Sequence, residues 1–248
     1  MSQLDRGAVD RALRRESPDT FGTTAFYASI GRALVTMCGV IAVLFLIELI
    51  NYLSSGALDR DGGIIPRHLG GLDGVVFAPF LHASWAHLYG NAVPFLLTGT
   101  FVLASGGRRF VWVTILVTLI SGLTVWIFGS GLTVGVSGVI FGYLGFLLMR
   151  GVVERSWWNI AVALFIGLLY WSAFTVTLPG DPRISWQGHI AGFLSGVLAA
   201  FLLRRRRPKP SQPPAVGAAT TLSTPTIPLT SPTIPLTSPT KSPEPSSD

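Results

Sequence analysis

The stretch Gly135-Val136-Ser137-Gly138 joins a glycine-rich loop to an apolar segment that continues to Met149. This pattern predicts a helix that begins at Ser137. The first N–H groups of a helix have no partner within the helix, and the helix dipole favours negative charge at that end. Ser137 is therefore either an N-capping serine, which is a common arrangement, or a nucleophile whose oxyanion the helix start would stabilise.

The composition indicates that much of the chain lies in lipid. Of its 248 residues, 49% are hydrophobic and 12% are charged, with a mean hydropathy of +0.55, whereas soluble domains carry about 25% charged residues. The net charge of +6 could favour nucleic acid. The arginines, however, flank apolar segments and form no basic face with interleaved aromatics. We therefore expect a lipid bilayer, and no nucleic acid, as a partner.

Six apolar segments predict the fold. A helix needs about 20 mostly apolar residues to cross a bilayer, so we expect an all-α membrane protein built as a six-transmembrane-helix bundle. The segments are residues 33–53, 87–104, 110–128, 137–149, 157–176 and 186–203.

The distribution of Lys and Arg predicts the orientation. With the N-terminus in the cytoplasm, only Arg60, Arg67 and Arg183 of the 18 Lys and Arg residues lie outside. This agrees with the positive-inside rule and with an even number of spans. We expect a multi-pass protein of a bacterial plasma membrane, with both termini cytoplasmic.

The chain divides into three predicted regions. Residues 1–30 form a cytoplasmic N-terminal segment, residues 31–205 form the six-span core, and residues 206–248 form a Pro/Ser/Thr-rich cytoplasmic tail. Within the tail, residues 225–231 repeat as residues 232–238. Proline at this density prevents regular structure, so the tail is expected to be disordered. It is either inert or a docking or phosphorylation segment.

The fourth apolar segment is short for a span. Its 13 residues make a helix of about 20 Å, against a hydrocarbon core of about 30 Å. If Arg150 marks the inner interface, Ser137 lies below the outer surface and residues 129–135 descend to it. Non-helical backbone at that depth requires protein walls or a water-filled cavity, so we expect Ser137 to face a cavity open to the outside.

His189, in the sixth segment, is a candidate base for Ser137. Ionisable residues within spans are rare and usually functional, and a neutral imidazole can accept the proton of a serine. The alternative is an interfacial histidine satisfied by backbone or water. Small residues at four-residue spacing let membrane helices approach closely, which predicts that the fourth and sixth segments bring Ser137 and His189 within hydrogen-bond reach. The glycines concerned are Gly138 and Gly142, and Gly188, Gly192 and Gly196.

His87 and Asn91 lie four residues apart in the second segment, and therefore on one helical face. Both can donate hydrogen bonds and could complete an oxyanion hole with the Ser137 N–H. Asparagine also commonly bonds between membrane helices. No carboxylate lies near His82 or His87 in the sequence, so we expect no metal site. Asp181 lies eight residues upstream of His189 in a proline-flanked loop, which favours a Ser–His dyad over a triad.

Three motifs together resemble the rhomboid family of intramembrane serine proteases. They are His87-x-x-x-Asn91, Gly135-x-Ser137-Gly138 and His189-x-x-Gly192-x-x-x-Gly196, in the second, fourth and sixth segments. The resemblance covers residues 31–205 and implies a rhomboid-like bundle with a short fourth helix. It implies Ser137 as nucleophile, His189 as general base, and His87 and Asn91 as oxyanion donors.

The resemblance also implies structural roles. Gly135 would permit the tight loop, and Gly138 and Gly192 would permit close helix packing. Phe141 stands where family members often carry a tyrosine stacked on the histidine, so the stacking is kept without the hydroxyl. The first loop departs from the family pattern, because Asp73-Gly74 stands where a Trp-Arg pair is often found.

We therefore expect an intramembrane serine endopeptidase that cleaves single-span membrane proteins near the outer face, with no metal or other cofactor. The family implies substrate entry between the second and fifth segments. The aromatic side chains of the fifth segment either form a gate there or contact lipid. The alternatives are a non-catalytic rhomboid-like protein that binds transmembrane helices, and a small transporter or channel, which more often shows inverted repeats or several buried charges.

Overall fold

The computed structural model describes residues 21–169 and 185–204, and the regular secondary structure of this part is helical apart from one isolated β-bridge. Its long helices fall on the six apolar segments. They are α2 (Thr24–Leu53), α5 (Trp85–Ala104), α6 (Gly107–Phe128), α7 (Ser137–Val153), α8 (Trp157–Leu169) and α10 (Trp186–Leu202). The loop between α2 and α5 contains α3 (Ala57–Gly62), η1 (Leu69–Gly71), α4 (Gly74–Phe77) and η2 (Ala78–Phe80).

Two of the described helices are long and apolar enough to cross a membrane by their own length and composition. They are α2, with 30 residues, and α6, with 22 residues, whereas α7, α8 and α10 are shorter apolar helices. The predicted tail, the first 20 residues, and the predicted continuation of the fifth segment to Val176 lie outside the described residues. The all-helical class is confirmed, and the count of six spans stays a prediction.

The fourth helix is longer than predicted. α7 has 17 residues, or about 25 Å, and Arg150 lies inside it. Arg150 Nε donates to Glu154 Oε2 at 2.8 Å, and Nη2 of Arg109, from α6, donates to Oε1 of the same carboxylate at 2.7 Å. The predicted end of this helix at Met149 was therefore wrong, because α7 ends at Val153. Arg150 pairs with Glu154 one turn later, and the helix continues beyond it to Val153.

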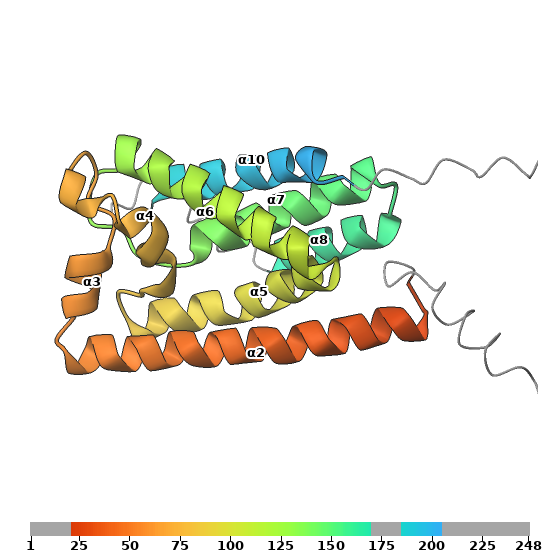
Figure 1. The fold of residues 1–248 in the computed structure, drawn as a ribbon, viewed down its shortest axis with the longest axis horizontal. Coiled ribbons are helices and arrows are strands. Elements are labelled where there is room, and N and C mark those ends of the chain that lie inside the picture. The colour runs from red at the N-terminus through yellow and green to blue at the C-terminus, as the bar shows by residue number, and fades with distance from the viewer. Residues whose placement is uncertain (1–20, 170–184, 205–248) are drawn as a thin grey trace, which may run out of the picture. The chain divides into compact units, whose positions relative to one another are not determined.

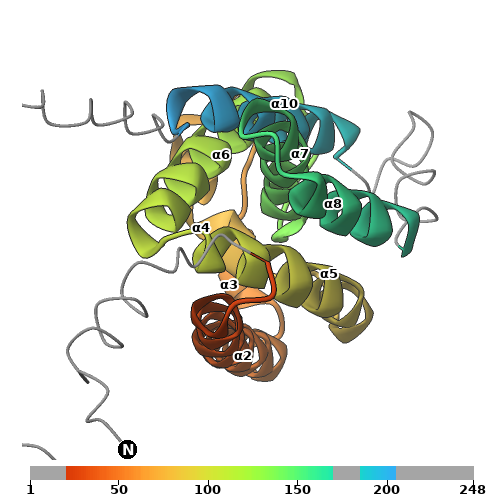
Figure 2. The same cartoon turned by 90° about the vertical axis from the view of Figure 1, so that its right-hand side faces the viewer.

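α7 is the central helix of the bundle (Figures 1 and 2). It packs against α5, α6, α8 and α10, while α2 packs against α5 on the outside. Most residues of α7 are buried. A helix that is apolar on all sides belongs in an interior, and the run of apolar residues that follows Ser137 gives α7 this character. The first turn of α7 is consequently surrounded by other helices.

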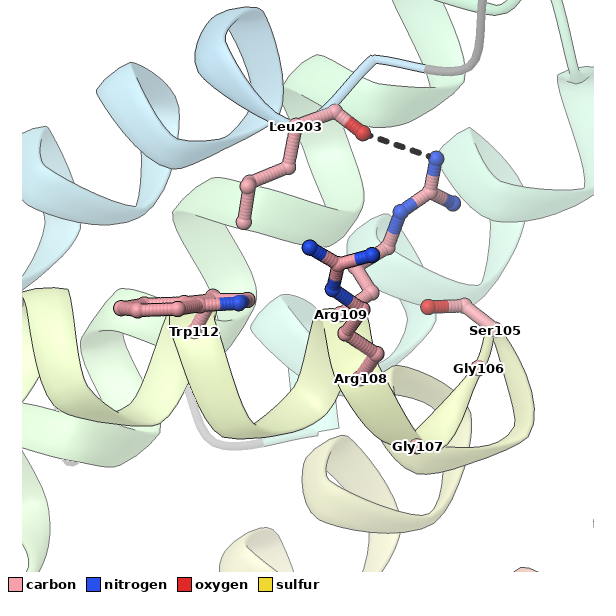
Figure 3. A pocket seen from close by; sticks show the side chains of 7 residues that line it. All are labelled: Ser105, Gly106, Gly107, Arg108, Arg109, Trp112 and Leu203. Atoms are coloured by element: carbon pink, nitrogen blue, oxygen red, sulfur yellow. Dashed lines mark hydrogen bonds between the residues drawn. The ribbon is translucent and has the colours of Figure 1, made fainter.

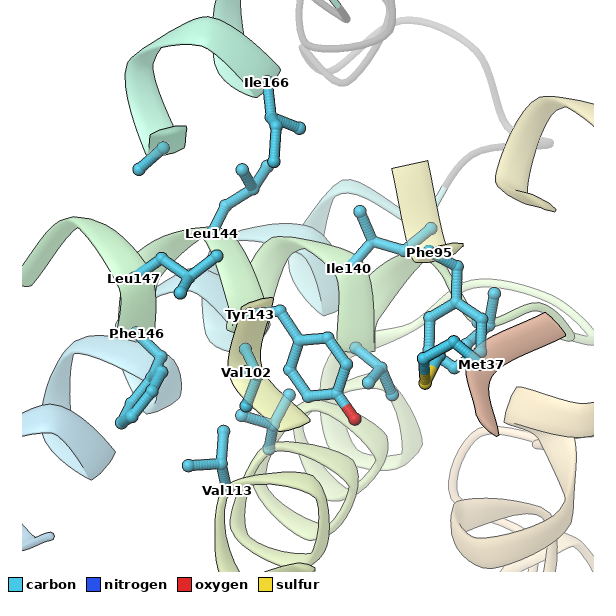
Figure 4. Packing of buried hydrophobic residues seen from close by; sticks show 14 of the residues in the cluster. Met37, Phe95, Val102, Val113, Ile140, Tyr143, Leu144, Phe146, Leu147 and Ile166 are labelled. Carbon is cyan, nitrogen blue, oxygen red and sulfur yellow. The ribbon is translucent and has the colours of Figure 1, made fainter. Parts of the chain in front are cut away.

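Tyr143 of α7 joins three helices in the core (Figure 4). Its ring is fully buried and lies parallel to Phe95 of α5, with ring centroids 6.1 Å apart. Its hydroxyl lies 2.7 Å from Oγ1 of Thr114 in α6. A buried tyrosine hydroxyl usually finds such a partner, so this residue fixes α7 against both neighbours.

Glycines bring α7 and α10 into backbone contact. A Cβ on Gly192 would meet the carbonyl oxygen of Gly138, and a Cβ on Gly196 would meet that of Gly142. Gly142 itself faces α6, because a Cβ there would meet Val117. The close approach expected from the glycine spacing is therefore present, and the glycines of α7 also make room for a second helix.

We predict that Gly196→Ala destabilises the bundle. The added methyl group has no space between α10 and α7, and overpacking of this kind costs about 1–3 kcal/mol. The matched control is Gly39→Ala in α2, where a Cβ meets nothing within 4 Å. Unfolding of the purified full-length variants in detergent, by heat or denaturant, measures the difference. Equal stability of the two variants would contradict the proposed backbone contact.

Candidate active site

Ser137 is the first residue of α7. The N-cap is Val136, which makes no side-chain cap bond, and Ser137 Oγ lies 2.8 Å from Nε2 of His189. The N-cap alternative for Ser137 was therefore wrong, because its hydroxyl contacts another helix rather than its own helix start. The Ser137 N–H remains among the first N–H groups of α7, which have no partner within a helix.

His189 lies in the first turn of α10, which begins at Trp186. The ring of Phe141, one turn into α7, stacks on the imidazole with centroids 4.4 Å apart and an interplanar angle of 15°. This stacking sets the plane of the imidazole while Nε2 faces Ser137. Within the described residues Nδ1 has no hydrogen-bond partner, and Asp181 lies outside them. Among the described residues, the site is therefore a pair of Ser137 and His189 without a third member.

Gly135 shapes the loop in front of α7. Its φ is +121°, and a Cβ there would lie 2.7 Å from Cε1 and 2.9 Å from Nε2 of His87. A side chain at this position would therefore be strained and would displace the imidazole. The Gly135 N–H donates to the carbonyl of Ala78 at 2.8 Å, and the bridge between Ile64 and Thr133 ties the same loop to the α2–α5 connection.

α5 brings His87 and Asn91 to this loop. The helix begins with Ser84 as N-cap, whose Oγ accepts from the His87 N–H at 3.2 Å. Asn91 follows one turn later. It is buried, and its Nδ2 has no hydrogen-bond partner in the described part of the chain. This nitrogen lies 3.7 Å from the position of a Cβ on Gly135, so both side chains meet the backbone that leads into Ser137.

A small cavity of about 40 Å³ adjoins Ser137 and His189. Thr118 and Ser121 of α6 are among its lining residues. It has room for water but not for a large side chain. Sequence reasoning missed these two α6 residues. The available signal was the pair Ser121-Gly122, two small residues within an otherwise apolar helix.

The arrangement combines a hydroxyl, an imidazole and several hydrogen-bond donors. A serine paired with a histidine can act as a nucleophile, and donors at a helix start can stabilise the oxyanion that forms in acyl transfer. Among residues 21–169 and 185–204, no group of three or more His, Cys, Asp or Glu side chains is placed to hold a metal ion.

Comparison with known proteins gives consistent matches. The family model of the rhomboid domain matches residues 69–206. An uncharacterized protein of Mycobacterium tuberculosis is 40% identical over 178 residues, which are 68% of this chain and 74% of that protein. RHOMBOID-like protein 4 of Arabidopsis thaliana is 30% identical over 159 residues, 60% of this chain and 39% of that protein.

The rhomboid protease GluP of Bacillus subtilis is 31% identical over 130 residues, which are 50% of this chain and 24% of that protein. The matched domain contains the second, fourth and sixth apolar segments, and with them His87, Asn91, Ser137 and His189. The chain therefore belongs to the rhomboid family of integral membrane proteins.

Proposed function

We propose that the protein is an intramembrane serine endopeptidase that cleaves single-span membrane proteins near the outer membrane face. The observation that carries this proposal is the 2.8 Å approach of Ser137 Oγ to His189 Nε2 at the start of a buried helix. Hydroxyl and imidazole groups are costly to bury without a purpose or a partner. Membership of the rhomboid family supports the same reaction.

The proposal includes a six-span topology with both termini in the cytoplasm. α2 and α6 support two of the crossings directly. The other long helices are packed beside them in the same bundle, and the excess of Lys and Arg on one side supports the orientation. In this topology the start of α7 faces the outer side, where water can reach the site.

The reaction would begin with proton transfer from Ser137 to His189. Nε2 accepts the hydroxyl proton as Oγ attacks the scissile carbonyl, and the resulting imidazolium then protonates the leaving amine. A water molecule, activated by His189, would hydrolyse the acyl-enzyme and regenerate the serine. Phe141 would hold the imidazole plane throughout these steps.

The oxyanion would be stabilised by the Ser137 N–H together with His87 and Asn91. The Ser137 N–H is at the positive end of α7. Nδ2 of Asn91 is buried without a partner among the described residues, so it is available as a donor. Gly135 would keep His87 close to the site, since no side chain separates them.

The small cavity bears on the choice of substrate. Its volume of about 40 Å³ beside Ser137 would accept only a small side chain next to the scissile bond. A substrate helix must also unwind to expose that bond, which glycine or proline would ease. We expect substrates with small and helix-breaking residues near the outer end of their span, entering between α5 and α8.

A cleavage assay tests the proposal. Full-length protein in liposomes is mixed with single-span reporter proteins whose spans contain Gly, Ala and Pro near one end. Ser137→Ala should lower the cleavage rate by about 10³-fold or more. The matched control is Ser195→Ala in α10, whose hydroxyl donates to the carbonyl of Gly192 in its own helix.

Two outcomes would count against catalysis at Ser137. Equal cleavage by wild type and Ser137→Ala would exclude the serine as the nucleophile. Equal binding of the reporters by both proteins, with cleavage by neither, would support the alternative of a non-catalytic rhomboid-like protein that binds transmembrane helices.

We predict that Asn91→Ala lowers kcat and leaves the fold intact. Loss of one oxyanion donor costs about 3–4 kcal/mol of transition-state stabilisation, whereas KM should change little. The thermal unfolding midpoint should stay near that of wild type, because Nδ2 bonds no described residue. Unchanged turnover in a folded Asn91→Ala protein would contradict the assignment.

We also predict that Gly135→Ala abolishes most activity. The new methyl group would strain the backbone and displace His87. Gly131→Ala serves as the control in the same loop, since a Cβ at Gly131 meets nothing within 4 Å. Comparable cleavage by the two variants would mean that the position of His87 does not matter for the reaction.

A further inference from the structure

A second cavity lies where α5 turns into α6, beside the end of α10 (Figure 3). Its volume is about 500 Å³, within the range typical of ligand sites. It is separate from the Ser137 site and shares no lining residue with the small cavity there. The lining residues are Ser105, Gly106, Gly107, Arg108, Arg109, Trp112 and Leu203.

Two guanidinium groups dominate the polar part of this cavity. Arg109 is buried and fixed in place, because its Nη2 donates to Glu154 Oε1 at 2.7 Å and to the carbonyl of Leu203 at 3.0 Å. Arg108 is exposed, and no hydrogen bond or ion pair joins it to any described residue. One fixed and one adaptable guanidinium therefore face the same space (Figure 3).

The described side chains that line the cavity include two arginines, Arg108 and Arg109. Glu154 is the carboxylate that pairs with Arg109, and it also accepts from Arg150 at 2.8 Å. Two guanidinium groups thus share this carboxylate, and Arg108 brings a third positive charge to the cavity. No acidic residue is among the described residues that line the cavity. An anion in the cavity would compensate this excess of positive charge.

The other walls suit a lipid rather than a free ion. The indole of Trp112 is half-exposed beside the arginines, and Leu203 adds an aliphatic wall. Tryptophan with arginine is typical of the boundary between headgroups and acyl chains. Gly107 places no side chain in the cavity, and a Cβ at this position would meet nothing within 4 Å.

We propose that this cavity binds the phosphate headgroup of an anionic phospholipid, with Arg108 and Arg109 on the phosphate and Trp112 against the glycerol and upper acyl chains. Arginine is well suited to phosphate because its planar donors match the phosphate oxygens in pairs. Such a lipid would hold the start of α6 to the end of α10. The proposal requires a membrane environment and does not depend on catalysis at Ser137.

Lipid titration of the full-length protein in detergent tests this inference. The thermal unfolding midpoint is followed as phosphatidylglycerol or phosphatidylcholine is added. Phosphatidylglycerol should raise the midpoint of wild type more than phosphatidylcholine does. Arg108→Gln should raise the half-saturating concentration of phosphatidylglycerol about fivefold, the effect of one arginine at a lipid surface, and Arg108→Lys should recover most of the loss.

Two further variants test whether the lipid binds in this cavity or is attracted by the overall positive charge of the surface. Arg32→Gln removes an exposed arginine of α2 that does not line the cavity, and this variant should titrate like wild type. Gly107→Leu should fill the cavity and weaken phosphatidylglycerol binding while every arginine is kept.

Three results would overturn the inference. Equal weakening by Arg108→Gln and Arg32→Gln would mean that total charge, not this cavity, attracts the lipid. If phosphatidylglycerol stabilises Gly107→Leu at the same concentrations as wild type, the lipid binds outside this cavity. Inorganic phosphate that stabilises wild type as well as phosphatidylglycerol at the same concentration would make the ligand a soluble anion.

Discussion

The close backbone contact between α7 and α10 is the constraint on which the site depends. Gly192 and Gly196 of α10 lie against the carbonyls of Gly138 and Gly142, with no space for a side chain between them. This contact sets the distance and register of the two helices. Ser137 at the first residue of α7 is thereby placed against His189 in the first turn of α10.

Contacts of α7 and of its preceding loop with other parts of the bundle support that contact. α6 packs into the space left by Gly142, and the Tyr143 ring and hydroxyl hold α7 to α5 and α6. At the far end, Glu154 ties α7 to Arg109 of α6. The α2–α5 connection reaches the site through Gly135, whose N–H bonds Ala78. Helices distant in sequence thus converge on one serine.

Much of this arrangement could be predicted from the sequence, where the signals are local. Apolar runs mark the helices, and glycine spacing marks the α7–α10 contact. The stacking of Phe141 on the histidine was implied by the resemblance to the rhomboid family. The errors arose where the deciding partner is distant in sequence. α7 continues past Arg150, which pairs with Glu154 in the next turn, and Arg109 of α6 binds the same carboxylate. The contribution of Ser121 depends on how α6 packs against α7.

The central claim is that Ser137 is a nucleophile activated by His189, and covalent labelling by a fluorophosphonate probe tests it most directly. The full-length protein in detergent or liposomes is treated with the probe and the attached label is measured. The account predicts labelling of wild type and of Ser195→Ala, strongly reduced labelling of a folded His189→Ala protein, and none of Ser137→Ala. Equal labelling of wild type and Ser137→Ala would contradict it.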